Sequence, residues 1–265
     1  MEERIAADLH NHLGRYGIFR SFNDVIDTAS RNLGENGILG IVDCDDSRYK
    51  NFVEFRGGYR RIDIGNAVYV PDKRILIVRG QEVFTKEGHV LVLGVQKGKN
   101  IKSKKLEDAL KEATDLGGIK IADHPAYKNG ILESIKKNPS LLSYFDSWEV
   151  YNAGAELSLF GLLPKNANMK ANDFYYIVIR NSGHDVGACS FSDGHSTDII
   201  GRSYTLLPFP NIRNSTALAS SLRESLRKTK ELVYLINNPS KIDALKHLFN
   251  VLFLNRISPI RQLVK

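Results

Sequence analysis

Short apolar runs alternate with amphipathic stretches along the first 210 residues, which is the pattern of an α/β protein. The apolar runs are rich in Val, Ile and Leu, as buried parallel strands are. The predicted strands are Ile5–Leu9, Gly37–Asp43, Arg74–Glu82, His89–Gly94, Ile119–Ala122, Trp148–Tyr151, Val186–Ser190 and Tyr204–Leu207. The alternation therefore predicts an α/β fold with buried and largely parallel strands.

Helices are predicted between these strands. The stretch from Asn23 to Leu33 places its apolar residues on one face. Lys104–Leu116 repeats Leu and Ala at helical spacing, and Gly117-Gly118 stops it. Asn168–Asn181 is a third candidate helix, although the run Tyr175–Ile179 also has the β-branched character of a strand. The segment from Arg48 to Pro71 is expected to be a loop that shapes the pocket.

The pattern changes after Pro210. Ser215–Leu235 predicts one long amphipathic helix or two, and Asn237–Ser240 is a break because its proline cannot continue a helix. Lys241–Leu254 then predicts a further helix. We therefore divide the chain into a domain of residues 1–210 and a helical C-terminal appendage of residues 211–265.

The net charge of +7 lies wholly in this appendage, which carries ten basic and three acidic residues, so residues 1–210 are formally neutral. A basic segment of this kind can meet nucleic acid, an anionic membrane surface or an acidic partner. It can equally be a solvated helical face. Charge alone does not choose between these.

Composition indicates the broad class of protein but not its function. A hydrophobic fraction of 42% and a charged fraction of 25% are ordinary for a soluble globular protein. No apolar run approaches the roughly 20 residues of a membrane span, and no signal peptide is visible. Two cysteines, Cys44 and Cys189, are too few for a disulfide framework. We therefore expect a cytoplasmic protein without a membrane span.

Metal-binding side chains gather where the predicted strands begin and end. Two histidines at i and i+2, His10 and His12, point the same way from an extended segment, so both can reach one ion. The full set is His10, His12, Glu82, His89, His124, Asp193 and His195. In a barrel the carboxyl ends of the strands converge on one face, where active sites form. The sequence thus predicts one metal centre.

The motifs, taken in order, resemble those of the PHP (polymerase and histidinol phosphatase) family. They are Asp8-Leu9-His10-Asn11-His12, Gly40-Ile41-Val42-Asp43-Cys44-Asp45, Gly80-Gln81-Glu82-Val83, Gly88-His89-Val90-Leu91-Val92-Leu93-Gly94, Ala122-Asp123-His124-Pro125, Trp148-Glu149-Val150-Tyr151-Asn152-Ala153 and Ser192-Asp193-Gly194-His195-Ser196. The resemblance covers roughly residues 4–207. It implies a distorted (β/α)7 TIM-like barrel, so residues 1–210 are expected to form a PHP-like metal-binding barrel.

The resemblance also implies roles. His10, His12 and Asp193 would bind a first ion, and Glu82 would bridge it to a second, which His89 and His124 complete. His195 would serve a third ion, and Asp193 and His195 are the expected catalytic residues. Imidazole with carboxylate suits Zn, Mn or Fe. Arg202, Arg15 and Arg20 are candidate phosphate-binding residues, because a guanidinium can donate two hydrogen bonds to phosphate.

Two departures from the family pattern affect the third ion. Many relatives have a Ser-Asp-Gly-like stretch where this chain has Arg15-Tyr16-Gly17, which lacks a carboxylate. Relatives usually have histidine where this chain has Cys44. A thiolate can bind zinc, but a free cysteine is also a common buried residue. We therefore expect two tightly held divalent ions, with a third weak or absent.

The favoured function is hydrolysis of a phosphate monoester of a small metabolite or nucleotide by a metal-activated hydroxide. One alternative is a nuclease or other phosphodiesterase that binds nucleic acid through the basic appendage. Another is a non-catalytic metal-binding interaction module. Similar barrels also host other metal-dependent hydrolases, such as those that cleave C–N bonds. The oligomeric state stays open.

Overall fold

The computed structural model describes residues 4–13, 22–54, 58–156, 166–229 and 234–236. Its strands are β1 (Arg4–Asp8), β2 (Ile38–Asp43), β3 (Ile62–Asp63), β4 (Ala67–Val70), β5 (Ile75–Phe84), β6 (His89–Leu93), β7 (Ile119–Ala122), β8 (Ser147–Asn152), β9 (Gly187–Phe191), β10 (Ser203–Pro208) and β11 (Tyr234–Ile236). Its α-helices are α1 (Phe22–Leu33), α2 (Ser47–Glu54), α3 (Leu106–Asp115), α4 (Leu132–Lys137), α5 (Ala153–Glu156), α6 (Ala167–Phe174) and α7 (Ser215–Lys228). Helical turns of other types are η1 (Pro139–Tyr144), η2 (Tyr175–Ile179) and η3 (Thr197–Ile199).

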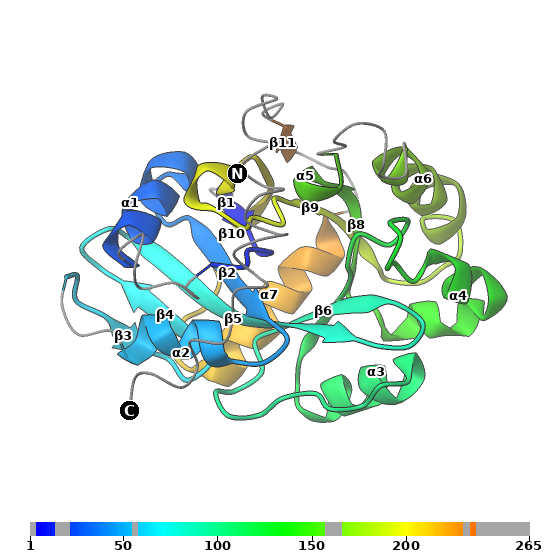
Figure 1. Ribbon diagram of the computed structural model, residues 1–265, viewed down its shortest axis with the longest axis horizontal. Coiled ribbons are helices and arrows are strands. Elements are labelled where there is room, and N and C mark those ends of the chain that lie inside the picture. The colour runs from blue at the N-terminus through cyan, green and yellow to red at the C-terminus, as the bar shows by residue number, and fades with distance from the viewer. Residues whose placement is uncertain (1–3, 14–21, 55–57, 157–165, 230–233, 237–265) are drawn as a thin grey trace, which may run out of the picture.

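The strands form one curled sheet with the order β11-β10-β1-β2-β5-β6-β7-β8-β9. Helices α1, α3, α4 and α6 lie around its outside (Figure 1). The path from β1 to β9 makes the wall of a distorted, nearly closed TIM-like barrel, as the sequence predicts. Strands β2, β5 and β7 are buried along almost their whole length and are made mainly of apolar residues.

The sheet is less parallel than the sequence predicts. β1, β2 and β5 are parallel, as are β7, β8 and β9, but β6 runs antiparallel to both its neighbours. The turn between β5 and β6 explains this, because Thr85 N–H donates to the Gly88 carbonyl at 3.0 Å. A connection this short makes a hairpin, whereas a parallel neighbour needs a long crossover.

Serine and threonine side chains join β9 to β10, where the barrel closes. Ser190 N–H donates to Thr205 Oγ1 at 2.9 Å, and Ser203 N–H donates to Ser192 Oγ at 3.1 Å. The Ser190 and Ser203 hydroxyls also hydrogen-bond to each other. These buried hydroxyls satisfy backbone groups at the seam. The seam holds β9, and with it the residues that follow β9, beside β1.

The predicted helices are confirmed where apolar residues recur at helical spacing. α1 buries Val25, Ile26, Ala29 and Leu33 against the sheet. α3 buries Leu106, Ala109, Leu110 and Ala113, and the chain turns at Gly117 with φ of 69°. The candidate from Asn168 to Asn181 is helical as α6 and the π-helical turn η2. Its β-branched run therefore does not form a strand.

The predicted loop from Arg48 to Pro71 is wrong, because this segment holds most of α2 and the β3–β4 hairpin. β4 also extends the sheet by pairing antiparallel with β5. The predicted helix from Ser215 to Leu235 ends at Lys228, and β11 pairs antiparallel with β10. The aromatic and β-branched residues of β11 favour that strand. The predicted helix Lys241–Leu254 lies outside the described residues.

Helix α7 packs on the barrel through a fully buried stripe. Leu218, Leu222 and Leu226 join the same apolar cluster as the strand residues Leu91 and Leu207. None of the helices in the described ranges has the length and apolarity that a bilayer crossing requires. The division at residue 210 stays a prediction, but α7 contributes to the barrel's core.

A buried aspartate fastens α7 to the barrel. Asp146 accepts hydrogen bonds from Lys120 N–H at 2.8 Å and from Arg227 Nε at 2.9 Å. Arg227 Nη2 lies 2.6 Å from the same carboxylate, and Lys120 Nζ lies 3.4 Å from it. Arg223 Nη2 donates to the Gly117 carbonyl at 2.8 Å. Two basic residues of the appendage therefore serve internal contacts.

We predict that Asp146→Ala lowers the free energy of unfolding by about 3 kcal/mol, because removing one member of a buried ion pair strands its partners. Denaturant unfolding measures this. Glu224→Ala, which removes an exposed partner of Lys228 on the same helix, should leave stability unchanged. Equal effects of the two substitutions would contradict the assigned role of Asp146.

Candidate metal centre

The loops after β1 and β9 are joined at the mouth of the barrel. His12 N–H donates to the Gly194 carbonyl at 2.7 Å, and Gly194 N–H donates to the His10 carbonyl at 3.2 Å. Asp8 is fully buried, and its carboxylate accepts hydrogen bonds from Ser192 N–H at 3.0 Å and Gly201 N–H at 2.9 Å. These contacts bring His10 and His12 next to Asp193.

Four side chains then meet around one point. His10 Nε2 lies 3.1 Å from His12 Nε2 and 3.5 Å from Asp193 Oδ1. His12 Nε2 lies 3.4 Å from both Asp193 Oδ1 and Glu82 Oε2. Ligands placed tetrahedrally at about 2.1 Å from an ion lie about 3.4 Å apart. These four separations are close to those of neighbouring ligands on one transition-metal ion.

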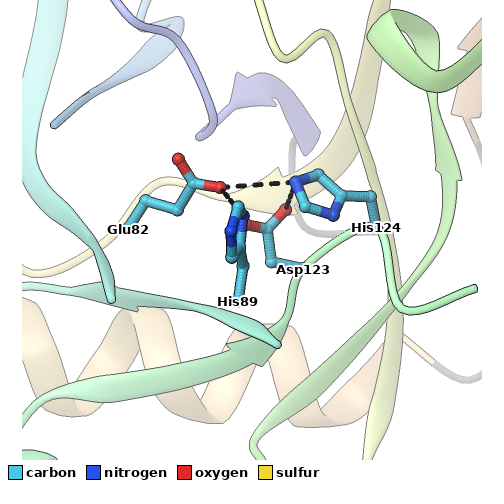
Figure 2. Close-up of side chains that lie close together, drawn as sticks. All are labelled: Glu82, His89, Asp123 and His124. Carbon is cyan, nitrogen blue, oxygen red and sulfur yellow. Dashed lines mark hydrogen bonds and ion pairs between the residues drawn. The ribbon is translucent and has the colours of Figure 1, made fainter. Parts of the chain in front are cut away.

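A second group surrounds the other oxygen of Glu82 (Figure 2). His89 Nδ1 lies 2.6 Å from Glu82 Oε1, and His124 Nε2 lies 3.3 Å from the same oxygen. Asp123 Oδ1 lies 3.4 Å from His124 Nε2. Glu82 thus turns Oε2 toward the first group and Oε1 toward the second, which is the arrangement of a bridging carboxylate.

His195 lies at the edge of the first group. Its ring stacks on His12 with centroids 4.5 Å apart, and its Nδ1 lies 3.8 Å from Asp193 Oδ1. His12, Asp193 and His195 form a third group that can hold a cation. The structure therefore brings together all seven predicted histidine and carboxylate ligands.

Two buried acids in the centre were missed as candidate ligands. Asp123 Oδ1 lies 3.2 Å from His10 Nδ1, and Glu149 Oε1 lies 4.0 Å from the same nitrogen. Glu149 Oε2 accepts hydrogen bonds from His124 N–H at 2.6 Å and Asn152 Nδ2 at 3.0 Å. The sequence feature that could have identified these two residues is an acid inside an otherwise apolar strand motif. Burying a carboxylate there is costly unless it has a positive or hydrogen-bonding partner.

Two of the expected ligands have a positive φ, a backbone conformation that glycine adopts more readily than other residues. His124 has φ of 24° and Asp193 has φ of 49°. Non-glycine residues rarely adopt positive φ, and those that do are concentrated at functional sites. The hydrogen bond from His124 N–H to Glu149 helps to hold that conformation.

The acids and imidazoles strongly perturb one another. Burial opposes charge on Glu82, but hydrogen bonds from His124 and His89 prevail and hold the pKa of this carboxyl well below its usual range. Burial likewise disfavours the charged His124, but the Asp123 and Glu82 carboxylates raise its pKa to about 10. Burial raises the pKa of Glu149 to about 7. Such perturbed groups are typical of functional sites.

Several buried atoms in the centre lack a hydrogen-bond partner within the described part of the chain. They are His10 Nδ1, both carboxylate oxygens of Asp123, His124 Nδ1 and Glu149 Oε1. Buried polar atoms without partners are rare, and each points to an ion, a water or a functional role. The donor set of imidazole and carboxylate fits divalent transition ions. The residues present therefore fit a metal centre.

The remaining predicted site residues lie apart from these groups. Cys44 is exposed and belongs to none of the metal-capable groups found among the described residues. Arg202 Nε donates to the Asp198 carbonyl at 3.2 Å. Arg15 and Arg20 lie outside the described residues. Roles for these four in metal or phosphate binding stay predictions.

Arg48 is a buried arginine beside the centre that the sequence did not single out. Its Nε lies 2.8 Å from Asp43 Oδ2, and its Nη1 donates to the His12 carbonyl. The Arg48 guanidinium, together with the hydrogen bond from Cys44 N–H, outweighs burial and lowers the pKa of Asp43. Arg48 thus fixes the backbone at His12.

Comparison with known proteins gives a fold relationship. No family model matches the sequence, and no curated protein matches it. A two-domain protein containing a predicted PHP-like metal-dependent phosphoesterase, from Bacteroides vulgatus ATCC 8482, aligns over 94% of this chain and 70% of its own, at 14% identity and a TM-score of 0.53. This chain has the fold of the PHP-like phosphoesterases. The resemblance seen in the sequence is confirmed at the level of the fold.

Two further solved structures share this PHP-like fold. PsfC from Pseudomonas syringae PB-5123 aligns over 94% of this chain and 98% of its own, with a TM-score of 0.62 and 15% identity. The novel lesion-specific endonuclease PfuEndoQ from Pyrococcus furiosus aligns over 88% of this chain and 58% of its own, with a TM-score of 0.55 and 15% identity. At this identity the likeness concerns the fold alone.

We predict that Zn²⁺ or Mn²⁺ raises the thermal midpoint of the chelator-treated protein by on the order of 5–10 °C, because only the folded chain assembles these ligands. Differential scanning fluorimetry measures the shift. Ca²⁺ is the control, since it prefers all-oxygen sites. Equal midpoints with and without Zn²⁺ or Mn²⁺ would argue against a metal centre.

Proposed function

We propose that this protein is a metal-dependent phosphoesterase that hydrolyses a phosphate monoester of a small metabolite or nucleotide. The observation that carries the proposal is the placement of Glu82, whose two oxygens face two separate histidine groups in a PHP-like barrel. Glu82 in this position would hold two divalent ions close together, and such a pair of ions would supply the chemistry of two-metal phosphoester hydrolysis.

The charge of the centre supports two ions. Glu82, Asp123, Glu149 and Asp193 are all buried or largely buried and together carry up to four negative charges. Buried carboxylates are costly without counter-charge. Two divalent ions supply four positive charges, and the imidazole-rich ligands favour Zn, Mn or Fe. A third ion at His195 is not needed to balance the centre.

The chain's own residues have separate tasks in this proposal. Bound divalent ions supply a hydroxide near neutral pH and neutralise charge on the phosphoryl oxygens. Asp193 holds His10 and His12 in place from the loop after β9. His195 lies at the edge of the centre, where its imidazole can pass a proton to the leaving oxygen. Its Nδ1 lies 3.1 Å from the Asp193 carbonyl, which orients the ring.

A phosphodiesterase acting on nucleic acid is the second candidate, and the endonuclease PfuEndoQ shares the fold. Two of the ten basic residues of the appendage serve internal contacts, since Arg227 pairs with Asp146 and Arg223 donates to a glycine carbonyl. Because these two cations hold α7 on the barrel, they do not form an open binding surface for the phosphate backbone of a nucleic acid. We therefore favour the monoester, and a non-catalytic metal-binding module is the remaining alternative.

We predict that the protein loaded with Mn²⁺ or Zn²⁺ hydrolyses p-nitrophenyl phosphate in preference to bis-p-nitrophenyl phosphate. Glu82→Gln should lower kcat by about 100-fold or more, since it removes the shared ligand of both ions. Glu224→Gln, on the exposed face of α7, is the control and should retain full activity. A preference for the diester would favour the second candidate. No turnover with bound metal would favour the non-catalytic module.

A further inference from the structure

Asp123 occupies an unusual place at the end of β7. Its side chain is fully buried, and both carboxylate oxygens lack a hydrogen-bond partner in the described residues. It is also the acid shared by two of the metal-capable groups, one with Glu82, His89 and His124 and one with His10 and Glu149. A buried carboxylate with no hydrogen bonds is unfavourable unless it serves a cation or a charged neighbour.

The two nitrogens of His10 face different partners. Nε2 lies in the first group, 3.1 Å from His12 Nε2 and 3.5 Å from Asp193 Oδ1. Nδ1 points the other way, with Asp123 Oδ1 as its nearer acid at 3.2 Å and Glu149 Oε1 at 4.0 Å. A neutral imidazole that binds an ion through one nitrogen carries its proton on the other. Asp123 Oδ1 is therefore the acid nearest to a proton on His10 Nδ1, at ion-pairing distance from it.

The same carboxylate also reaches the second group. Asp123 Oδ1 lies 3.4 Å from His124 Nε2, which is 3.3 Å from Glu82 Oε1 (Figure 2). These separations match those of neighbouring ligands on one transition-metal ion. Asp123 thus lies at a ligand position of the second ion while it contacts a ligand of the first.

The backbone is shaped to make this possible. Neighbouring residues of an extended strand point to opposite faces, so Asp123 and His124 would not normally both face the centre. The positive φ of His124, at 24°, breaks that alternation. Glu149 Oε2 secures the break by accepting the His124 N–H at 2.6 Å and is itself held by Asn152 Nδ2.

We propose that Asp123 couples the two ion positions. It orients His10 through Nδ1, which presents Nε2 to the first ion, and it completes the ligand set of the second ion beside Glu82 and His124. A second carboxylate, Glu149, acts through the backbone of His124 to keep both side chains aimed inward. This inference rests on the proposed two-ion centre and adds to it a residue that makes the two ions interdependent.

Calorimetric titration of the chelator-treated protein with Zn²⁺ and with Mn²⁺ tests the coupling. The wild-type chain should bind two equivalents. Asp123→Asn should weaken both binding steps at least about tenfold, the effect typical of losing a partner of a metal-binding histidine. Asp46→Asn is the matched control, because Asp46 is also a buried aspartate beyond a barrel strand but lies outside the metal-capable groups.

A second readout separates orientation of His10 from a general loss of structure. In the zinc-loaded wild-type protein, the Nδ1–H proton of His10 should give a downfield NMR signal, which moves upfield in Asp123→Asn and stays in place in Asp46→Asn.

The outcomes are distinct for the two proposals. If the wild-type chain binds no ion, the two-ion centre itself is wrong, and the coupling fails with it. If the wild-type chain binds two ions and Asp123→Asn weakens only one step or neither, the two-ion centre stands and the coupling is overturned. Weakening of both steps with an altered His10 signal supports it.

Discussion

Four carboxylates lie within hydrogen-bonding or ion-pairing distance of one cluster of histidines in the barrel mouth, and their mutual repulsion is the constraint on which the rest of the site depends. Glu82, Asp123, Glu149 and Asp193 have little access to water. Their charges need positive partners at short range, since the low dielectric of the interior makes an unpaired charge costly. Imidazoles and divalent ions are the partners that the ligand geometry accommodates.

The barrel provides the rigid frame that this charge requires. The side-chain hydrogen bonds between β9 and β10 close the sheet. The backbone bonds between His12 and Gly194 then place Asp193 beside the histidines after β1. The bonds of Gly194 with His10 and His12 join segments about 180 residues apart in the chain, so the first group of ligands exists only once the barrel has closed. Metal binding is therefore coupled to completion of the fold.

Much of the fold and most of the site could be predicted from local patterns. Apolar runs gave the eight main strands, and metal-capable side chains at their ends gave the seven expected ligands, because strand termini converge in a barrel. The strands and site residues that the local patterns did not predict depend on tertiary contacts. Strand β11, for example, pairs with β10, which precedes it by a whole helix, α7. Asp123 was missed because strand alternation turns it away from His124, and only the positive φ at His124 reverses this.

Anomalous diffraction from crystals grown with Zn²⁺ or Mn²⁺ tests the central claim most directly, because it locates each ion among its ligands. The account predicts two peaks about 3.5–4 Å apart, joined by Glu82. One should lie among His10, His12 and Asp193, and the other among His89, Asp123 and His124. A single peak, or none within reach of Glu82, would contradict a bridged two-ion centre.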